Sequence, residues 1–404
     1  MKNKINIMFI VFVLFITGCN NNNLDQEKII LDSLSLEEKI AQMLIIYHPS
    51  NEYDEKIKSI IKELKPGGFI LMNNNISTYD KTLNLVTSMQ NDSEIPMIIA
   101  IDQEGGSVQR LKSISDVEVT DIPYMYYLGQ TNNKDLAYSV GKIMAEQLRT
   151  IGVNLTFAPV MDIYTNINNT VIGKRSFGSD VETVYNMATA LKKGIEDNGI
   201  NTCIKHFPGH GATETDSHIS LPIVNKTIKE LETSDLIPFT KSIKNTNMIM
   251  IGHIALPNIT GDNTPSSISK EIITSLLKEK YNYQGLVVTD ALNMKALTNN
   301  YTYKQIYIMA INAGVDLLLM PNDPQKAIDY IKEAIINKEI DETTINESVY
   351  KILKYKVQID KENHFKLNYC YSSTNVTNGY GIIRIENVGV NTEIGKIGKS
   401  LKRV

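Results

Sequence analysis

The feature that most constrains the fold is the alternation of short apolar runs with amphipathic segments along most of the chain. The apolar runs are too short for buried helices and nearly continuous, as in strands covered on both faces. The predicted strands are 67–72, 96–102, 155–162, 202–206, 248–253, 285–290 and 315–320. Helical patterns cover 79–91, 133–150, 180–198, 226–244, 267–281, 302–312 and 343–357. This alternation predicts a parallel sheet with helices on both faces.

The number of strand and helix units predicts a barrel. A (β/α)8 barrel runs from about 200 to more than 400 residues with insertions. We therefore predict an α/β fold, a (β/α)8 TIM-type barrel, as a single main domain over residues 31–360, with 361–404 as a short C-terminal tail. Its first helix follows Ser35, with Glu38 completing a capping box. A doubly wound open sheet is the alternative.

Most predicted strands end on a polar or charged residue. These strand-end residues are Asp102, Asp162, Lys205 with His206, His253 and Asp290. In a barrel, the carboxyl ends of the strands meet at one rim, where ligands bind. The side chains are therefore expected to converge at one mouth, which is the layout of an active site.

The segment 203–218 concentrates the chemistry of the chain, because it holds three of its six histidines. Its central run, Phe-Pro-Gly-His-Gly over 207–211, breaks any regular element, since proline lacks a backbone donor and glycine tolerates unusual dihedrals. Charged and imidazole groups therefore lie where a strand ends and a loop begins. We predict that Gly209 and Gly211 act as hinges of this loop.

A metal site is one alternative for this segment, with His206, His210, Asp216 and His218 as ligands. The glycines on either side of His210 disfavour it, because metal ligands are normally held rigidly by a second shell of partners. We therefore expect no metal and no cofactor.

Glycoside hydrolysis is a chemistry that these groups could perform. It needs a carboxylate below the anomeric carbon and a proton donor at the leaving oxygen. Asp290, at a strand end, suits the first role, although an aspartate there could equally cap a following helix. If the Asp216 carboxylate meets the His218 imidazole, it favours the imidazolium and leaves the other nitrogen to exchange a proton. A loop turn with a solvated histidine is the alternative.

The N-terminus predicts export. Two lysines precede an apolar run over 5–16, which is too short to favour a membrane-spanning helix and has the layout of a secretory signal. Residues 16–19, Ile-Thr-Gly-Cys, resemble a bacterial lipobox, which implies removal of 1–18 as a lipoprotein signal peptide and a lipid on Cys19. Residues 19–30 then form a polar tether. We expect a protein of the bacterial cell envelope, anchored to the membrane by lipid and facing outside the cytoplasm; a plain signal peptide or short anchor is the alternative.

Charge and cysteine content give no indication of nucleic-acid binding, of a disulfide or of a cysteine metal site. The formal net charge is −4 and the basic residues are spread along the chain, so no basic face typical of nucleic-acid binding is predicted. Cys203 and Cys370 lie far apart, and their spacing does not suggest a disulfide. The sequence has no paired-cysteine metal pattern.

A family resemblance is carried by several motifs. The run Lys205-His-Phe-Pro-Gly-His-Gly211 with Asp216-Ser-His218 resembles the signature of the β-N-acetylhexosaminidases of glycoside hydrolase family 3. Further segments similar to that family are 34–43, 102–106, 108–110, 157–162, 172–178 and 288–292. Together they span about residues 30–360 in the order of the family.

The resemblance implies a TIM-barrel domain that removes terminal N-acetylglucosamine with retention of configuration. Asp290 matches the nucleophile, His218 the acid/base and Asp216 its partner. The positions that match sugar-holding residues are Asp102, Arg110, Arg175, Lys205 and His206. The implied partner is a carbohydrate with a terminal β-linked N-acetylglucosamine. Ser107 and Ala212 depart from the family pattern and could loosen the loops around the site.

Other functions remain open at this point. The family includes β-glucosidases and β-xylosidases, which usually take the acid/base from a second domain. A neutral imidazole would not repel an anionic acceptor, so a GlcNAc phosphorylase is a second alternative. A sugar-binding lipoprotein is a third; it would need neither Asp290 nor His218. With the lipobox, the expected substrates are peptidoglycan fragments or chito-oligosaccharides.

Overall fold

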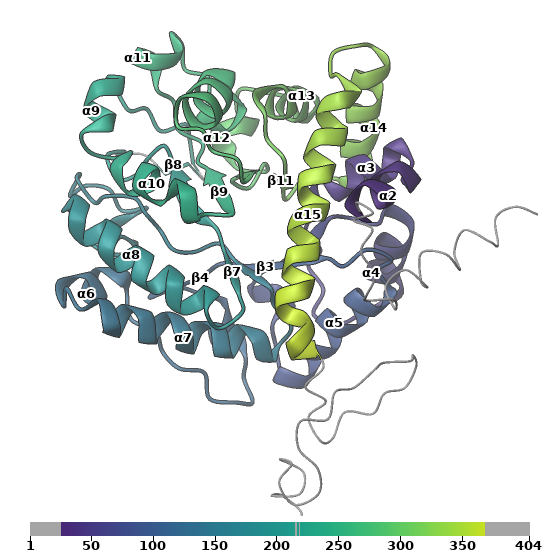
Figure 1. The fold of residues 1–404 in the computed structure, drawn as a ribbon, viewed down its shortest axis with the longest axis horizontal. Helices are drawn as coiled ribbons and strands as arrows, with labels where there is room; N and C mark the ends of the chain where they lie inside the picture. Colours follow the sequence, from purple (N-terminus) through teal and green to yellow (C-terminus); the bar gives the residue numbers. More distant parts are fainter. Residues whose placement is uncertain (1–25, 215, 218, 368–404) are drawn as a thin grey trace, which may run out of the picture.

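The computed structural model describes residues 26–214, 216–217 and 219–367 (Figure 1). Its parallel strands form two ladders, in the order β11-β1-β2-β3-β6-β7 and β10-β9-β8. These strands are β1 (Leu44–Ile46), β2 (Gly68–Leu71), β3 (Ile98–Ile101), β6 (Leu155–Thr156), β7 (Asn201–Thr202), β8 (Ile204–Phe207), β9 (Met248–Ile251), β10 (Leu286–Thr289) and β11 (Leu318–Leu319). A small antiparallel pair is formed by β4 (Gln103–Gly105) and β5 (Val108–Gln109). Every predicted strand run therefore contains a strand.

Two isolated parallel bridges connect the ladders. Val160 pairs with Lys205, and Val288 pairs with Leu317. Only Cys203 separates β7 from β8, so the chain passes directly from one ladder into the other. The fold is a TIM-barrel-like α/β fold, as predicted.

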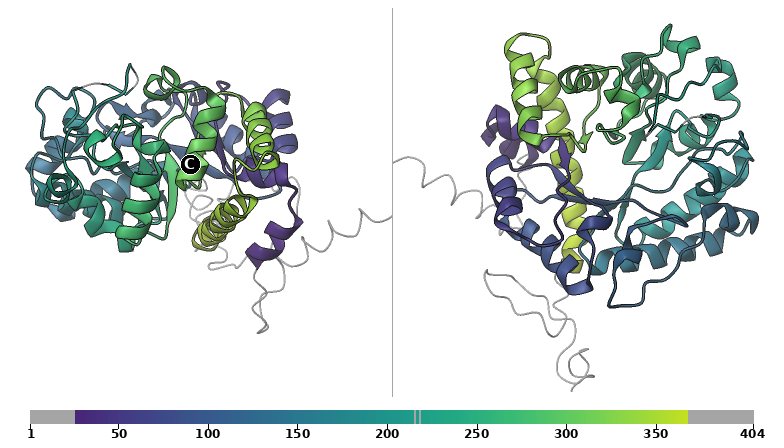
Figure 2. Two further views of the ribbon diagram at one scale, coloured as in Figure 1. Left: turned by 90° about the horizontal axis from the view of Figure 1, so that it is seen from above. Right: turned by 180° about the vertical axis from the view of Figure 1, so that it is seen from behind.

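The helices surround these strands. The α-helices are α2 (Gln26–Ser33), α3 (Leu36–Gln42), α4 (Glu55–Ser59), α5 (Tyr79–Asp92), α6 (Met125–Gln130), α7 (Lys134–Thr150), α8 (Val181–Glu196), α9 (Ile228–Glu232), α10 (Ile237–Ser242), α11 (Pro257–Thr260), α12 (Lys295–Thr298), α13 (Tyr303–Ala313), α14 (Pro324–Ile336) and α15 (Glu342–Leu367). Tighter or wider helical turns are η1 (Ile60–Leu64), η2 (Asn73–Asn75), η3 (Arg110–Ser113), η4 (Gly173–Arg175), η5 (Ile243–Asn245), η6 (Ser266–Ile268) and η7 (Glu271–Lys280). Helices α7 and α8 lie side by side, and α15 packs against α2 and α3 (Figures 1 and 2).

Some helix predictions are confirmed and others are wrong. The capping box of α3 is present, since Ser35 Oγ accepts from the Glu38 N–H and the Glu38 carboxylate accepts from the Ser35 N–H. The helix predicted over 226–244 is instead two short helices, α9 and α10, because Pro238 lies in the first turn of a new helix. The last helix is longer than the predicted pattern over 343–357. Helix α15 continues to Leu367, since no proline or glycine interrupts it.

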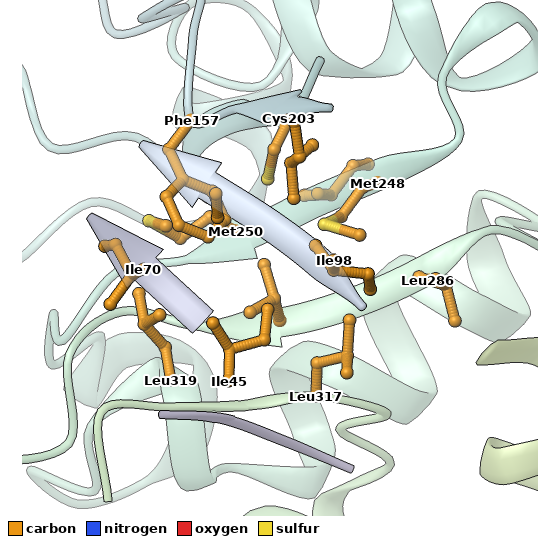
Figure 3. Close-up of a cluster of buried hydrophobic side chains, with 14 of the residues drawn as sticks. Ile45, Ile70, Ile98, Phe157, Cys203, Met248, Met250, Leu286, Leu317 and Leu319 are labelled. Carbon is orange, nitrogen blue, oxygen red and sulfur yellow. The ribbon is translucent and has the colours of Figure 1, made fainter. Parts of the chain in front are cut away.

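A cluster of buried apolar side chains fills the space between the strands (Figure 3). Side chains from several strands point toward one another there, among them Ile45 of β1, Ile70 of β2, Ile98 of β3, Met250 of β9 and Leu319 of β11. Burial of one such side chain contributes about 1.5–3 kcal/mol. This core fixes the strands relative to one another, and with them the residues that follow their carboxyl ends.

A buried lysine connects α15, the last helix of the described chain, with α3 near its start. Lys356 of α15 donates to Oε1 of Gln42 in α3 at 2.7 Å, and burial lowers the pKa of Lys356 to about 7. Between this value and the ordinary 10.5, the unfolded chain binds more protons than the folded one. This group therefore makes stability rise with pH across that window.

Replacing Lys356 by methionine should remove this pH dependence. We expect Lys356→Met to raise the free energy of unfolding at neutral pH by a few kcal/mol, about 1.4 for each pKa unit shifted. Urea denaturation at both ends of the window measures the change. A variant whose stability still rises with pH as steeply as the wild type would contradict the assignment.

None of the described helices is long and apolar enough to cross a membrane. The apolar run 5–16 and the predicted lipidation site Cys19 lie outside the described residues, as does Cys370. Cys203 is a buried free thiol. The predicted domain boundaries at 18, 30 and 360 stay predictions.

Candidate active site

Five of the six predicted strand-end residues lie at the carboxyl ends of parallel strands, whereas Asp162 lies beyond the end of β6, which stops at Thr156. Asp102 follows β3, Lys205 and His206 lie on β8, His253 follows β9 and Asp290 follows β10. Because these strands run in the same direction, their carboxyl ends lie at one edge of the sheet.

A network of ion pairs through two carboxylates, Asp102 and Glu104, joins four of the predicted sugar-holding residues. The Lys205 ammonium lies 2.7 Å from Asp102 Oδ1 and 2.5 Å from Glu104 Oε1. Arg175 donates to both oxygens of Glu104 at 2.8 Å, and Arg110 lies 3.7 Å from Asp102 Oδ2. The network therefore brings together Asp102, Arg110, Arg175 and Lys205, while their role in holding a sugar stays a prediction.

His206 is held between Asp162 and Arg175. Its Nδ1 lies 2.6 Å from Asp162 Oδ2, and its Nε2 lies 3.4 Å from Arg175 Nη2. The Asp162 carboxylate also accepts from the backbone N–H of His210 at 2.7 Å. Burial would raise the pKa of Asp162, but His206 and these hydrogen bonds lower it below its ordinary value. Asp162 is therefore an ionised acceptor that fixes the direction of the His206 ring.

Asp290 has the properties expected of an ionised carboxylate. Its Oδ1 accepts from the N–H of Ala291 at 2.7 Å, and the carbonyl of Ala291 lies 3.0 Å from His253 Nε2. Burial would raise the pKa of Asp290, but His253, His206, this N–H and Lys205 together lower it. The helix-cap alternative is wrong, because α12 begins only at Lys295.

The loop after β8 is anchored by His210. Its Nδ1 lies 2.7 Å from Thr213 Oγ1 and its Nε2 lies 3.4 Å from Ser217 Oγ. Asn169 donates to the carbonyl of His210 at 2.8 Å. Burial, with the neighbouring His206, lowers the pKa of His210 to about 4. His210 is therefore a neutral, buried anchor of the loop.

The far part of this loop lies against the segment that follows Asp290. The carbonyl of Ser217 accepts from the N–H of Ala296 at 3.1 Å. The carbonyl of Ile219 accepts from the side chain of Asn299 at 3.5 Å. The loop and the predicted nucleophile thus belong to neighbouring parts of the same edge.

His218 lies outside the described residues. Asp216 is half-buried, and its carbonyl accepts from the N–H groups of Ile219 at 2.9 Å and Ser220 at 3.0 Å. The predicted pair of Asp216 and His218 stays a prediction. In the described part of the chain, no group of three or more histidine, cysteine, aspartate or glutamate side chains could hold a metal ion.

The two loop glycines are tightly packed. A Cβ on Gly211 would lie 1.7 Å from the carbonyl oxygen of Ile163, and one on Gly209 would lie 2.7 Å from the Asp235 Cβ. Gly209 also has a φ of +126°, which favours glycine. Close approach therefore explains both glycines, while the predicted hinge motion stays a prediction.

The sequence pattern did not assign a role to Glu104, Asp162 or His253. Asp162 follows the isolated bridge at Val160 and His253 follows β9, but their contacts are with residues distant in the chain. Glu104 lies two residues beyond Asp102 in the run Asp-Gln-Glu-Gly-Gly. This short spacing is the signal that could have placed Glu104 at the same rim.

Comparisons with known proteins show which family the chain is similar to. Residues 35–355 match the model of the glycosyl hydrolase family 3 N terminal domain. Beta-hexosaminidase A of Pseudoalteromonas piscicida is 31% identical over 337 residues, which cover 76% of this chain and 56% of that protein. The chain thus spans little more than half of that relative. A beta-hexosaminidase of Tolumonas auensis is 34% identical over 281 residues, which cover 69% of this chain and 82% of the relative.

Solved structures give the same result. A glycoside hydrolase family 3 beta-N-acetylglucosaminidase from Paenibacillus sp. superposes with a TM-score of 0.77 at 30% identity, over 90% of this chain and 67% of that one. The beta-N-acetylglucosaminidase from Thermotoga maritima superposes with a TM-score of 0.69 at 26% identity, over 79% and 67%. The chain therefore belongs to glycosyl hydrolase family 3, in the group of its β-hexosaminidases.

Proposed function

We propose that the protein is a retaining exo-β-N-acetylglucosaminidase, which removes terminal N-acetylglucosamine from peptidoglycan fragments or chito-oligosaccharides. The observation that carries this proposal is the placement of Asp290. It is a carboxylate with a lowered pKa at the same edge as a network of two arginines, a lysine and a histidine. Relatives of 31% and 34% identity that are named beta-hexosaminidase support the activity.

The ion-pair network is suited to holding a sugar. Asp102 keeps lone pairs that can accept from hydroxyl groups, while Arg175 and Lys205 can only donate. Because these acceptors and donors have fixed positions, they can distinguish sugars by the directions in which the hydroxyl groups of the ring point. The sugar would lie between this network and the Asp290 carboxylate.

The reaction proceeds in two steps under this proposal. Asp290 attacks the anomeric carbon, while His218, oriented by Asp216, gives a proton to the leaving oxygen. The C–O bond to the aglycone breaks, and a glycosyl-aspartate forms. His218 then takes a proton from water, which displaces Asp290, so the two inversions give net retention.

A panel of nitrophenyl β-glycosides tests the substrate. The N-acetylglucosaminide should be cleaved with the highest kcat/KM. Cleavage of the glucoside without the N-acetylglucosaminide would reverse the assignment. Phosphate-dependent release of the sugar 1-phosphate, in place of free sugar, would identify a phosphorylase instead.

The proposal includes a closed (β/α)8 barrel over 31–360. Two parallel bridges support it, because each connects one ladder to the other: Val160, after β6, pairs with Lys205 of β8, and Val288 of β10 pairs with Leu317, next to β11. A crystal structure should show paired strands at both of these bridges. A wide gap between the strands at either bridge would contradict a closed barrel.

The signal peptide over 1–18, the tether over 19–30 and the lipid on Cys19 are proposed from the sequence motif. They place the enzyme on the outer side of a bacterial membrane. Metabolic labelling with a palmitate analogue should mark the wild type but not Cys19→Ala. An unlabelled wild type would contradict the anchor.

The packing of Gly211 leads to a further prediction. In Gly211→Ala the new methyl group overlaps the Ile163 carbonyl, so the loop must shift. A shift of about 1 Å can cost on the order of a hundredfold, and we expect kcat/KM to fall by about 10- to 100-fold.

Gly141→Ala is the matched control for this substitution. Its methyl group would meet the Leu191 carbonyl oxygen at 2.2 Å, between α7 and α8. This change should lower the melting temperature and leave kcat/KM nearly unchanged. Equal loss of kcat/KM in both variants would contradict a specific role of the loop.

A further inference from the structure

Glu104 lies at the centre of the ion-pair network and is almost completely buried, with 2% of its surface exposed. Its Oε2 accepts from Arg175 Nε at 2.8 Å. Its Oε1 accepts from Arg175 Nη2 at 2.8 Å and from the Lys205 ammonium at 2.5 Å. Both oxygens are therefore occupied by cations of the protein.

Glu104 accepts from two N–H groups of Arg175 and one of Lys205. Arg175 has five N–H groups and Lys205 has three. In Arg175, two point to Glu104, one faces His206 at 3.4 Å and one donates to the Val171 carbonyl at 3.0 Å. In Lys205, one points to Glu104 and one donates to Asp102 at 2.7 Å. Among contacts of the described residues, each cation thus keeps one N–H.

The direction of these remaining donors depends on Glu104. The guanidinium of Arg175 is planar, so two parallel hydrogen bonds to one carboxylate fix the orientation of its other N–H groups. The ammonium of Lys205 is held between two carboxylates, so its third N–H also has a fixed direction.

Glu104 stays ionised over the working range of the protein. Burial would raise the pKa of Glu104, but Arg175 and Lys205 hold it well below the ordinary value. A carboxylate in this state neither gives nor takes protons during a reaction. Its effect is therefore one of geometry and charge.

We infer that Glu104 is a positioning residue for sugar recognition, which aims one N–H of Arg175 and one of Lys205 at hydroxyl or carbonyl oxygens of the bound sugar. The inference rests on the proposed function, since the sugar is the ligand. Glu104 itself acts only through the two cations.

The test compares Glu104→Gln with the wild type on a nitrophenyl N-acetylglucosaminide. The amide keeps the size of the side chain, but it has one acceptor oxygen in place of two and no charge, so the two parallel hydrogen bonds from Arg175 cannot both form. We expect KM to rise by about 10- to 100-fold, the scale of a misplaced binding group, and kcat to fall by much less. Glu104→Asp keeps the charge and should recover part of the loss.

Glu196→Gln is the matched control. Glu196 pairs with Lys192 at 2.7 Å and accepts from Thr202 at 2.5 Å, and none of these residues belongs to the ion-pair network. The control should lower the melting temperature without changing KM. A change in KM as large as that of Glu104→Gln would show a general effect of lost ion pairs and would overturn the inference.

Deoxy analogues of the substrate separate positioning from a structural role. Removing the hydroxyl that the two cations bind should weaken the wild type strongly and Glu104→Gln only slightly. Equal losses in both proteins for every analogue would overturn the inference, as would an unchanged KM in Glu104→Gln. A wild type that cleaves no N-acetylglucosaminide would instead overturn the proposed function.

Discussion

Replacing Asp290 by alanine is expected to lower kcat by about 10⁴- to 10⁶-fold, the range found when a catalytic unit loses a central member. The reason is that the other carboxylates in the network are already committed. Asp102 and Glu104 accept from Lys205, and Asp162 accepts from His206 and His210. Asp290 instead accepts from the backbone N–H of its neighbour Ala291. Steady-state hydrolysis of a nitrophenyl N-acetylglucosaminide measures the loss.

Asp316→Asn serves as the control for a buried aspartate. Asp316 accepts from the N–H of Val287 at 2.9 Å and lies 3.7 Å from the Lys278 ammonium. Val287 lies within β10, whereas Asp290 follows that strand. The control should lose stability while keeping its kcat. Turnover near the wild-type rate in Asp290→Ala would exclude Asp290 as the nucleophile.

Replacing His218 by alanine is expected to slow cleavage of sugar aglycones by about 10²- to 10⁴-fold, the usual contribution of general acid and base catalysis. For a substrate with a dinitrophenyl leaving group, the decrease in the rate of the first step should be smaller, because that group departs without protonation. Because the pKa of Asp290 is lowered, this carboxylate should already be ionised at neutral pH. A change of kcat/KM with pH near about 6.5 should therefore come from the titration of His218. A leaving-group series and the pH profile measure both effects.

Two controls test whether the loss of activity in His218→Ala comes from the missing acid/base. Azide needs no general base and should restore the second step in His218→Ala, giving the β-glycosyl azide. Ser220→Ala, in the same loop, should keep the leaving-group dependence and the pH limb of the wild type. An equal loss for all leaving groups in His218→Ala would contradict its role as the acid.

Local signals explain which parts of the fold could be predicted. The start of α3 was predictable because Ser35 and Glu38 stand three residues apart, and α5, α7, α8 and α13 have clear amphipathic patterns. Strand β1 was missed because its three residues follow α3 with only Met43 between them. No turn residue marks that change from helix to strand.

The site could be predicted only in part. Asp102, Lys205 and Asp290 were predictable because parallel strands place their carboxyl ends at one edge. The role of Glu104 depends on Arg175, which is 71 residues away in the chain. Such a pairing is set by tertiary packing, so a spacing pattern within one segment cannot reveal it.

The loop after β8 shows the same limit. Its glycines and proline predicted a break in regular structure, which is correct. Burial of His210 was not predictable, because it depends on Asn169 from a distant segment and on Ser217. The base of the loop is thus a packed structure, although its composition is typical of a mobile one.

The most direct test of the account is a trapped covalent intermediate. The protein is incubated with a 5-fluoro N-acetylglucosaminyl fluoride, a slow substrate that accumulates the glycosyl-enzyme, then digested with pepsin and analysed by mass spectrometry. We expect one added sugar on the peptide that contains Asp290. A sugar on a peptide with Asp102 or Asp216, or no adduct in a protein that turns over the substrate, would contradict it.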